Sequence, residues 1–108
     1  MKYKVKFKVW LEKDDEIIMG LGREKLLKAI KKHGSISKAA KELGISYKKA
    51  WSYIKAMEER LGKKLVETKI GGSGGGGSKL TKEAEKLIKE FDKILETVEK
   101  ALSKINKK

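Results

Sequence analysis

The spacing of apolar and polar residues predicts a short strand pair followed by helices. Apolar residues at positions 3, 5, 7, 9 and 11 alternate with lysines at positions 2, 4, 6 and 8, and this period of two from Tyr3 to Leu11 predicts a half-buried strand. Residues 13–15 (Lys-Asp-Asp) predict a turn, and residues 16–19 predict a short second strand that pairs back on the first. The period then changes, and residues 23–32 predict a helix that ends at a glycine.

Residues 34–62 have the pattern of two helices joined by a tight turn. Ser35 and Ser37 are both candidates to cap the first helix, since a serine hydroxyl accepts from the free N–H groups of a first turn. Gly44 stands where that helix must end, and Ser46 is placed to cap the second helix. One side of the second helix is apolar, through Ala50, Ile54, Met57 and Leu61. The stretch therefore predicts a helix-turn-helix, whose second helix enters the major groove of DNA.

The opposite side of the second helix is polar and, in its first half, cationic. Its members are Lys48, Ser52, Lys55 and Glu59, with Lys49 and Ala56 beside them. In a helix-turn-helix the first half of this side meets base edges and phosphates, whereas on an ordinary helix it is only a solvated charged face. Tyr47 and Trp51 lie near the edge of the apolar side. Both are expected to pack on the core or on the hairpin described next, because aromatic rings bury large areas.

Two short β-capable runs, residues 65–69 and 78–81, surround a glycine-rich stretch at residues 71–77. A hairpin directly after a helix-turn-helix is a wing, and its glycines let the backbone approach a phosphate closely. Lys69 and Lys79 add positive charge at its base. An engineered flexible linker has the same composition and stands as an alternative. A phosphate-binding P-loop is disfavoured because its lysine and serine stand in reversed order.

From Lys82 the chain predicts one helix of about 23 residues, capped by Thr81. Apolar residues repeat along it at alternating spacings of three and four, namely Ala84, Leu87, Phe91, Ile94, Val98, Ala101 and Ile105, widened by Ile88, Leu95 and Leu102. The helix would extend about 35 Å, which is longer than a domain of the remaining chain is wide. We therefore expect a homodimer through this helix, with a helix packed on its own domain as the alternative. The expected dimer-interface residues are Leu87, Phe91, Ile94, Leu95, Val98 and Leu102.

The charge of the chain favours a polyanionic partner. Its 108 residues carry 28 Lys and Arg against 15 Asp and Glu, a net charge of +13. Such a field attracts nucleic acid and also anionic membranes, but no apolar run is long enough to cross a membrane, and no membrane partner is expected. Cysteine is absent and His33 is the single histidine, so neither a metal, a cofactor nor an enzymatic site is expected. Because the amino terminus lacks a signal-peptide pattern, the protein is expected in the cytoplasm.

Particular residues resemble a known family. The chain contains the pattern AA-x-x-L-x-x-S (Ala39, Ala40, Leu43, Ser46), followed by Ile54, Met57-Glu58, Leu61-Gly62, Leu65 and Leu80-Thr81. This order of residues resembles the LysR-type winged helix-turn-helix. The chain also contains GSIS (residues 34–37), SYKKAW (residues 46–51) and the glycine-rich wing. More specifically, these segments resemble the N-terminal DNA-binding domain of the ModE type, the molybdate-responsive transcription regulators. The resemblance covers about residues 22–95.

This resemblance implies a domain that binds double-stranded DNA through the helix beginning near Ser46 and dimerises through long helices. By position it assigns Ser46, Tyr47, Lys48, Lys49 and Ser52 to DNA contact. It also implies that the glycine stretch is a native wing. Regulators of this type carry a C-terminal molybdate-binding region, for which a chain ending at Lys108 leaves no room. Binding of molybdate or another oxyanion is therefore not expected in this chain.

Together these observations predict a mainly α fold with small β, a winged helix-turn-helix with an N-terminal β-hairpin and a long C-terminal dimerisation helix. Residues 1–81 are expected to form the DNA-binding domain, with the strand or hairpin at 3–19 and the wing at 65–81, and residues 82–108 the dimerisation helix. The expected DNA-binding residues are Ser35, Ser46, Tyr47, Lys48, Lys49, Ser52, Lys55, Lys69, Gly74, Gly75 and Lys79. The predicted function is sequence-specific regulation of transcription. The alternatives are a sequence-indifferent nucleoid-type DNA- or RNA-binding protein and a coiled-coil interaction module without DNA binding.

Overall fold

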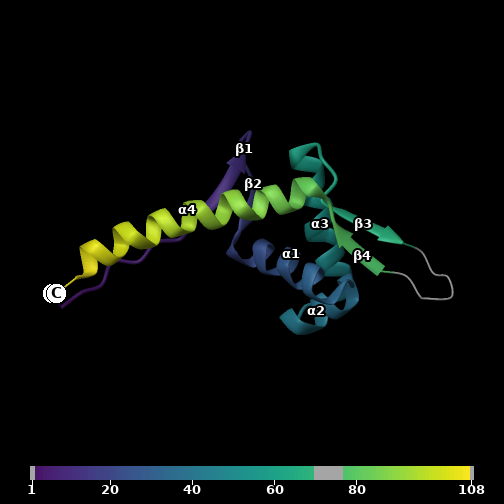
Figure 1. Cartoon of the computed structure of the whole chain (residues 1–108), viewed down its shortest axis with the longest axis horizontal. Helices are drawn as coiled ribbons and strands as arrows, with labels where there is room; N and C mark the ends of the chain where they lie inside the picture. Colours follow the sequence, from purple (N-terminus) through teal and green to yellow (C-terminus); the bar gives the residue numbers. More distant parts are fainter. Residues whose placement is uncertain (1, 70–76, 108) are drawn as a thin grey trace.

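A computed structural model of the chain describes residues 2–69 and 77–107. These parts contain four helices and two antiparallel strand pairs (Figure 1). In chain order the elements are β1 (Trp10–Lys13), β2 (Glu16–Gly20), α1 (Leu21–His33), α2 (Ile36–Leu43), α3 (Tyr47–Leu61), β3 (Val66–Lys69), β4 (Gly77–Leu80) and α4 (Lys82–Asn106). The arrangement confirms the predicted mainly α winged helix-turn-helix.

Glycines end the first three helices. Gly34, Gly44 and Gly62 follow α1, α2 and α3 with φ of 63°, 69° and 70°. Each donates its backbone N–H to a carbonyl of the preceding turn. A residue with a Cβ atom pays about 1–2 kcal/mol for this left-handed conformation, which explains why the chain carries glycine at all three helix ends.

Serine hydroxyls begin α2 and α3. Ser35 Oγ accepts a hydrogen bond from Lys38 N at 3.1 Å. Ser46 Oγ accepts in the same way from Lys49 N at 3.0 Å. Both bonds satisfy backbone donors that the first turn of a helix leaves free. Ser37, the other candidate cap, lies inside α2 instead.

A single apolar core joins the helices to both hairpins. It is built from Ile18, Met19, Leu26, Leu27, Ala29, Ile30, Ile36, Ala39, Ala40, Ala50, Ile54, Met57, Leu65, Val66, Leu80, Ala84, Leu87, Ile88 and Phe91. The core includes the predicted buried sides of α1 and α3, because the apolar residues of both helices recur at helical spacing. It also includes one residue from the end of each wing strand nearest the helices, so the base of the wing is packed against the domain.

Both hairpins are antiparallel; the register of the first shifts between Leu11 and Glu12, and that of the wing is regular. In the first, Lys13 lies opposite Glu16, so Asp14 and Asp15 form a two-residue turn. Their φ angles of 51° and 65° are positive, as in the type I′ turn that suits the twist of paired strands. In the wing the strands β3 and β4 pair from Val66 opposite Leu80 to Lys69 opposite Gly77. The predicted turn and the predicted wing are both confirmed in the described residues.

The predicted strand from Tyr3 to Leu11 is wrong for most of its length. Strand pairing begins only at Trp10, and residues 2–9 run without strand structure beside the C-terminal part of α4 (Figure 1). Val5 N donates to Asn106 Oδ1 at 2.9 Å, and Asn106 Nδ2 donates to Val5 O at 3.0 Å. The partner strand β2 has five residues and leads directly into α1. It therefore offers nothing opposite residues 2–9 for them to pair with.

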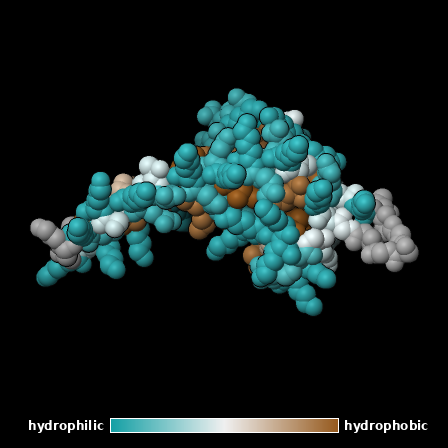
Figure 2. All heavy atoms as spheres, in the orientation of Figure 1, coloured by the Kyte–Doolittle hydropathy of each residue, from teal (hydrophilic) through white to brown (hydrophobic). Residues whose placement is uncertain are grey.

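The helix α4 has two halves in different surroundings. Thr81 Oγ1 caps it by accepting from Ala84 N at 3.2 Å, as predicted, and its first half supplies four residues to the core. The second half projects beyond the other helices, so the molecule measures 59 Å along its longest axis against 29 and 22 Å along the others (Figure 1). Figure 2 shows mostly hydrophilic side chains on this face, with hydrophobic atoms along the lower side of the projecting helix.

Candidate nucleic-acid interface

The outward side of α3 carries polar and cationic residues into solvent. Ala50, Ile54 and Met57 are buried on one side of this helix. Lys48, Lys49 and Ser52 are exposed, and the helical period places Lys48 and Ser52 opposite the buried stripe. Two turns of helix thus offer two ammonium groups and a hydroxyl together, a set that matches phosphate oxygens and base edges.

Tyr47 and Trp51 flank this cationic group, and the prediction that they pack on the core or the wing is wrong. Their side chains are 53% and 44% exposed. The hairpin β1–β2 contacts the far end of α3, where Arg60 Nη1 donates to Ile17 O at 2.6 Å. The described elements leave both rings partly in solvent. Lys55 Nζ lies 5.1 Å from the centre of the Trp51 ring, within the range of a cation–π contact.

A carboxylate joins α3 to the base of the wing. Glu58 Oε2 accepts from Leu65 N at 2.8 Å and from Val66 N at 3.1 Å. Lys55 Nζ lies 3.3 Å from Glu58 Oε1. Burial raises the pKa of Glu58, but the two backbone bonds and the Lys55 ammonium outweigh burial and hold the pKa below its ordinary value. The charged Glu58 therefore sets the position of the wing relative to the outward side of α3.

Sequence reasoning missed this role of Glu58. The residue entered only as one letter of the family pattern, and its partners stand seven and eight residues further along the chain. A signal did exist, because a glutamate on a helix directly before a turn and a strand can reach the free N–H groups that begin the strand.

The capping serines are already engaged. The Oγ atoms of Ser35 and Ser46, both predicted to contact DNA, accept backbone N–H bonds at the starts of α2 and α3. A serine hydroxyl retains its own O–H donor when it accepts a bond. The two residues therefore place the helix starts, and their direct contact with DNA stays a prediction.

The wing is anchored to the corner between α1 and α2. Ser78 N donates to Gly34 O at 2.8 Å, and a Cβ atom on Gly77 would lie 3.3 Å from the same oxygen. This close approach explains glycine at the start of β4. Lys69 and Lys79 are exposed on the wing strands, as their predicted role requires. The other predicted wing contacts, Gly74 and Gly75, lie outside the described residues.

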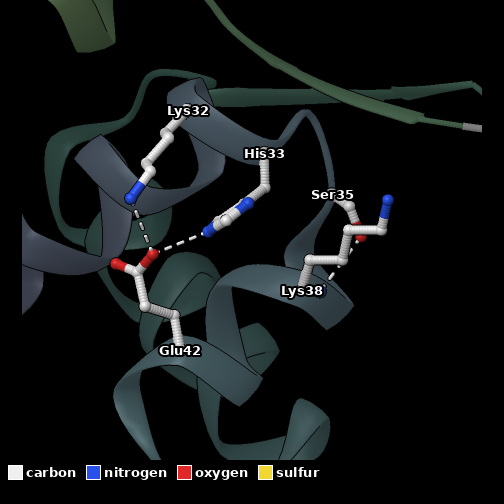
Figure 3. A network of polar contacts seen from close by, with 5 residues as sticks. All are labelled: Lys32, His33, Ser35, Lys38 and Glu42. Carbon is white, nitrogen blue, oxygen red and sulfur yellow. Dashed lines mark hydrogen bonds and ion pairs between the residues drawn. The ribbon is translucent and has the colours of Figure 1, made fainter.

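A second polar network holds the same corner from the other side (Figure 3). Lys32 and His33, at the end of α1, both point toward Glu42 of α2. Glu42 Oε1 lies 2.7 Å from His33 Nε2 and 3.2 Å from Lys32 Nζ. The hydrogen bonds from His33 and then from Lys32 lower the pKa of Glu42. His33 thus has a structural contact, and across the described residues no group of three or more His, Cys, Asp or Glu is placed to hold a metal.

The residues predicted for a dimer interface divide into two groups. Leu87 and Phe91 are buried in the core of their own chain, so the prediction that they face a partner is wrong. The first half of α4 lies against the domain, which covers that side. Ile94 is 38% exposed, and Leu95, Val98 and Leu102 are half-buried on the projecting half.

None of the described helices combines the length and apolar character that a membrane crossing requires.

These elements coincide with a known protein family. Residues 22–85 match the family described as bacterial regulatory helix-turn-helix protein, lysR family. The chain belongs to this lysR family. The match runs from α1 through the wing into the first turn of α4, so it covers every element that forms the candidate interface.

Within the lysR family, the domain is similar to ModE regulators and to a molybdenum-pterin-binding protein. It is 48% identical over 68 residues to the molybdenum-pterin-binding protein MopB of Rhodobacter capsulatus, covering 63% of this chain and 25% of that protein. It is 48% identical over 64 residues to the DNA-binding transcriptional dual regulator ModE of Escherichia coli (strain K12), covering 59% and 24%. This similarity confirms the predicted ModE-type domain. The chain matches about a quarter of the length of these curated relatives.

Solved structures of lysR-family domains have the same fold. The DNA-binding domain of BenM, in a complex with benA site 1 DNA, superposes with a TM-score of 0.59 at 28% identity, covering 81% of this chain and 95% of that one. The CbnR DNA-binding domain, also in a DNA complex, gives a TM-score of 0.58 at 25% identity, covering 77% and 90%. The helix-turn-helix and the wing of this chain are therefore in the arrangement that these domains share.

Proposed function

We propose that this lysR-family chain binds double-stranded DNA at specific sequences and regulates transcription. The observation that carries the proposal is the first half of α3, where Lys48, Lys49 and Ser52 are exposed together on the second helix of a helix-turn-helix. In this motif that part of the second helix lies in the major groove. Lysines there neutralise phosphates or reach guanine edges, and a serine hydroxyl bonds to base edges of either kind.

The wing extends this surface along the DNA backbone. Glu58 connects it to α3, and the bond from Ser78 to Gly34 connects it to the start of α2. Lys69 and Lys79 place positive charge on its strands, where they would contact phosphates. Support comes from the similar proteins as well, since ModE of Escherichia coli is described as a DNA-binding transcriptional regulator and the BenM and CbnR domains were solved with DNA. Such a regulator acts in the cytoplasm.

The active form in this proposal is a homodimer through the projecting half of α4. Ile94, Leu95, Val98 and Leu102 are apolar and only partly covered by their own chain. A second copy would bury them, and two α3 helices would then reach half-sites about one helical turn (~34 Å) or a multiple apart. Sedimentation of the wild type and of Val98→Asp tests this, with Glu96→Gln as the control on the outer side. A wild type that sediments as a monomer at every concentration rules out the dimer.

The test of DNA binding begins with a library of random duplexes, from which the full chain enriches the ones it binds. Fluorescence anisotropy then compares an enriched duplex with a scrambled duplex of the same composition. A sequence-specific regulator prefers the enriched site by about 10³-fold or more. Equal affinity for both would favour a sequence-indifferent nucleoid-type protein. Absence of binding to either at about 0.1 M salt, where non-specific DNA binders retain affinity, would favour an interaction module.

A further inference from the structure

The indole of Trp51 is an apolar surface in cationic and polar surroundings. Its side chain is 44% exposed, and the neighbours on the same side of α3 are Lys48 one turn before it, Lys55 one turn after it and the adjacent Ser52. An aromatic ring gains much free energy when its area is buried, yet the described elements leave nearly half of this side chain in solvent. Trp51 therefore offers a contact that lysine and serine cannot make.

The ring is also restrained before any partner binds. Lys55 Nζ lies 5.1 Å from the ring centre, and the same ammonium is 3.3 Å from Glu58 Oε1. Glu58 is in turn bonded to two backbone N–H groups at the base of the wing. One face of the indole is thus next to an ammonium group that is itself paired with Glu58. A side chain restrained in this way loses less entropy when it binds.

The major groove contains one exposed apolar group that such a ring can contact. Thymine carries a C5 methyl group there, whereas the other base edges present hydrogen-bond donors and acceptors. The charged and polar groups are matched by Lys48, Lys49 and Ser52, which leaves the methyl group as the partner of the indole. We infer that Trp51 contacts thymine methyl groups and makes α3 prefer sites with thymine at the position it faces. The inference rests on the proposed function, in which α3 enters the major groove.

The test removes only the methyl group from the DNA. Deoxyuridine pairs as thymidine does but lacks the C5 methyl, so each thymine of an enriched duplex is replaced by deoxyuridine in turn. The wild-type chain should lose affinity at one or more positions by about fourfold, the equilibrium factor for burying one methyl-sized group. Binding is measured by anisotropy at one fixed salt concentration.

Three variants assign the effect to the ring. Trp51→Ala should bind the unmodified duplex more weakly and should no longer distinguish thymine from uracil at the sensitive positions. Trp51→Phe keeps an aromatic ring without the indole N–H, so it should retain the distinction. Lys48→Ala is the control: it should weaken binding through lost charge and still distinguish the two bases. Circular dichroism of each variant checks that the helices are intact.

Two results would overturn the inference while leaving the proposed function in place. One is a wild-type chain that prefers its enriched duplex yet is indifferent to every deoxyuridine. The other is a Trp51→Ala variant that still loses the full fourfold in affinity when thymine is replaced by deoxyuridine. Weakened binding by both Trp51→Ala and Trp51→Phe, without any uracil effect, would mean that the indole N–H donates to DNA, and would also overturn it. Failure to enrich any duplex would instead overturn the proposed function and this inference together.

Discussion

Glu24 gives the fold a stability that falls as the pH rises. It is the buried charged residue among those described, 4% exposed in α1, with Lys28 Nζ 3.6 Å away. Burial raises its pKa from 4.5 to about 7, a hydrogen bond to Asp92 of α4 adds to the effect, and Lys28 opposes it. The pKa of Asp92 is lowered by the same hydrogen bond. Burial and the neighbouring Asp92 thus favour the protonated form of Glu24.

The sign and the size follow from linkage between protonation and folding. In the unfolded chain Glu24 loses its proton near pH 4.5, whereas in the folded chain it keeps the proton until about pH 7. Between these values the folded state binds more protons, so the free energy of unfolding decreases as the pH rises. The difference between the two pKa values corresponds to about 3 kcal/mol at about 1.4 kcal/mol per pH unit. This loss of unfolding free energy is complete above pH 7 and absent below pH 4.5.

Urea unfolding of the wild type and of Glu24→Gln at pH 5 and pH 8 measures this contribution. The amide is neutral at both values, so the variant should lose about 2–3 kcal/mol less stability than the wild type between them. The exposed Glu96, which pairs with Lys100 at 3.2 Å, supplies the control Glu96→Gln, whose pH dependence should follow that of the wild type. Identical pH dependence in Glu24→Gln and the wild type would refute the reasoning.

Further substitutions test the local contacts. Glu58→Ala leaves the N–H groups of Leu65 and Val66 without their acceptor and should destabilise the chain by about 2 kcal/mol in urea unfolding, while the exposed neighbour change Glu59→Ala should stay within about 0.5 kcal/mol. Because the pKa of Glu58 is lowered in the folded chain, Glu58 should stabilise the fold above the ordinary carboxyl pKa. This stabilisation should disappear as the pH falls through the pKa of Glu58 in the folded chain. A loss of stability in Glu58→Ala that persists in acid would contradict this. Gly44→Ala forces a Cβ atom into a φ of 69° and should lower stability by about 1–2 kcal/mol in thermal melts. Gly22→Ala, within α1, places its new Cβ atom more than 4 Å from every atom outside the adjoining backbone of its own helix and should be neutral or slightly stabilising. Equal losses of stability at both glycines would be incompatible with a conformational cause. Ser46→Ala removes the acceptor for Lys49 N and should lower the stability of the fold by about 1 kcal/mol. An unchanged melting temperature would contradict this expectation.

The parts of the fold that sequence could predict depend on local chemistry. Gly34, Gly44 and Gly62 end helices, and Ser46 and Thr81 begin them, because each acts on a backbone group a few residues away. The apolar stripe of α3 follows from the helical period in the same way. These features need no knowledge of what packs against them.

The features that sequence reasoning got wrong or missed depend on tertiary surroundings. Residues 2–9 alternate like a strand, but pairing depends on how long β2 continues opposite them. The seam on α4 is continuous in sequence, yet the domain covers Phe91 and leaves Ile94 partly exposed. Trp51 has the apolar area of a core residue, yet the described elements leave it 44% exposed. In each case the local pattern is right and the covering element decides the outcome.

The central claim is that the first half of α3 lies against DNA, and the salt dependence of binding tests it most directly. Anisotropy titrations with an enriched duplex, over about 50–200 mM salt, would compare the wild type with Lys49→Ala and with Lys104→Ala, a control at the far end of α4 (Figure 1). Loss of one phosphate contact makes the negative slope of log K against log salt shallower by about 0.9. We predict this shallower slope for Lys49→Ala and an unchanged slope for Lys104→Ala. An unchanged slope for Lys49→Ala, or an equally shallower slope for Lys104→Ala, would contradict the claim.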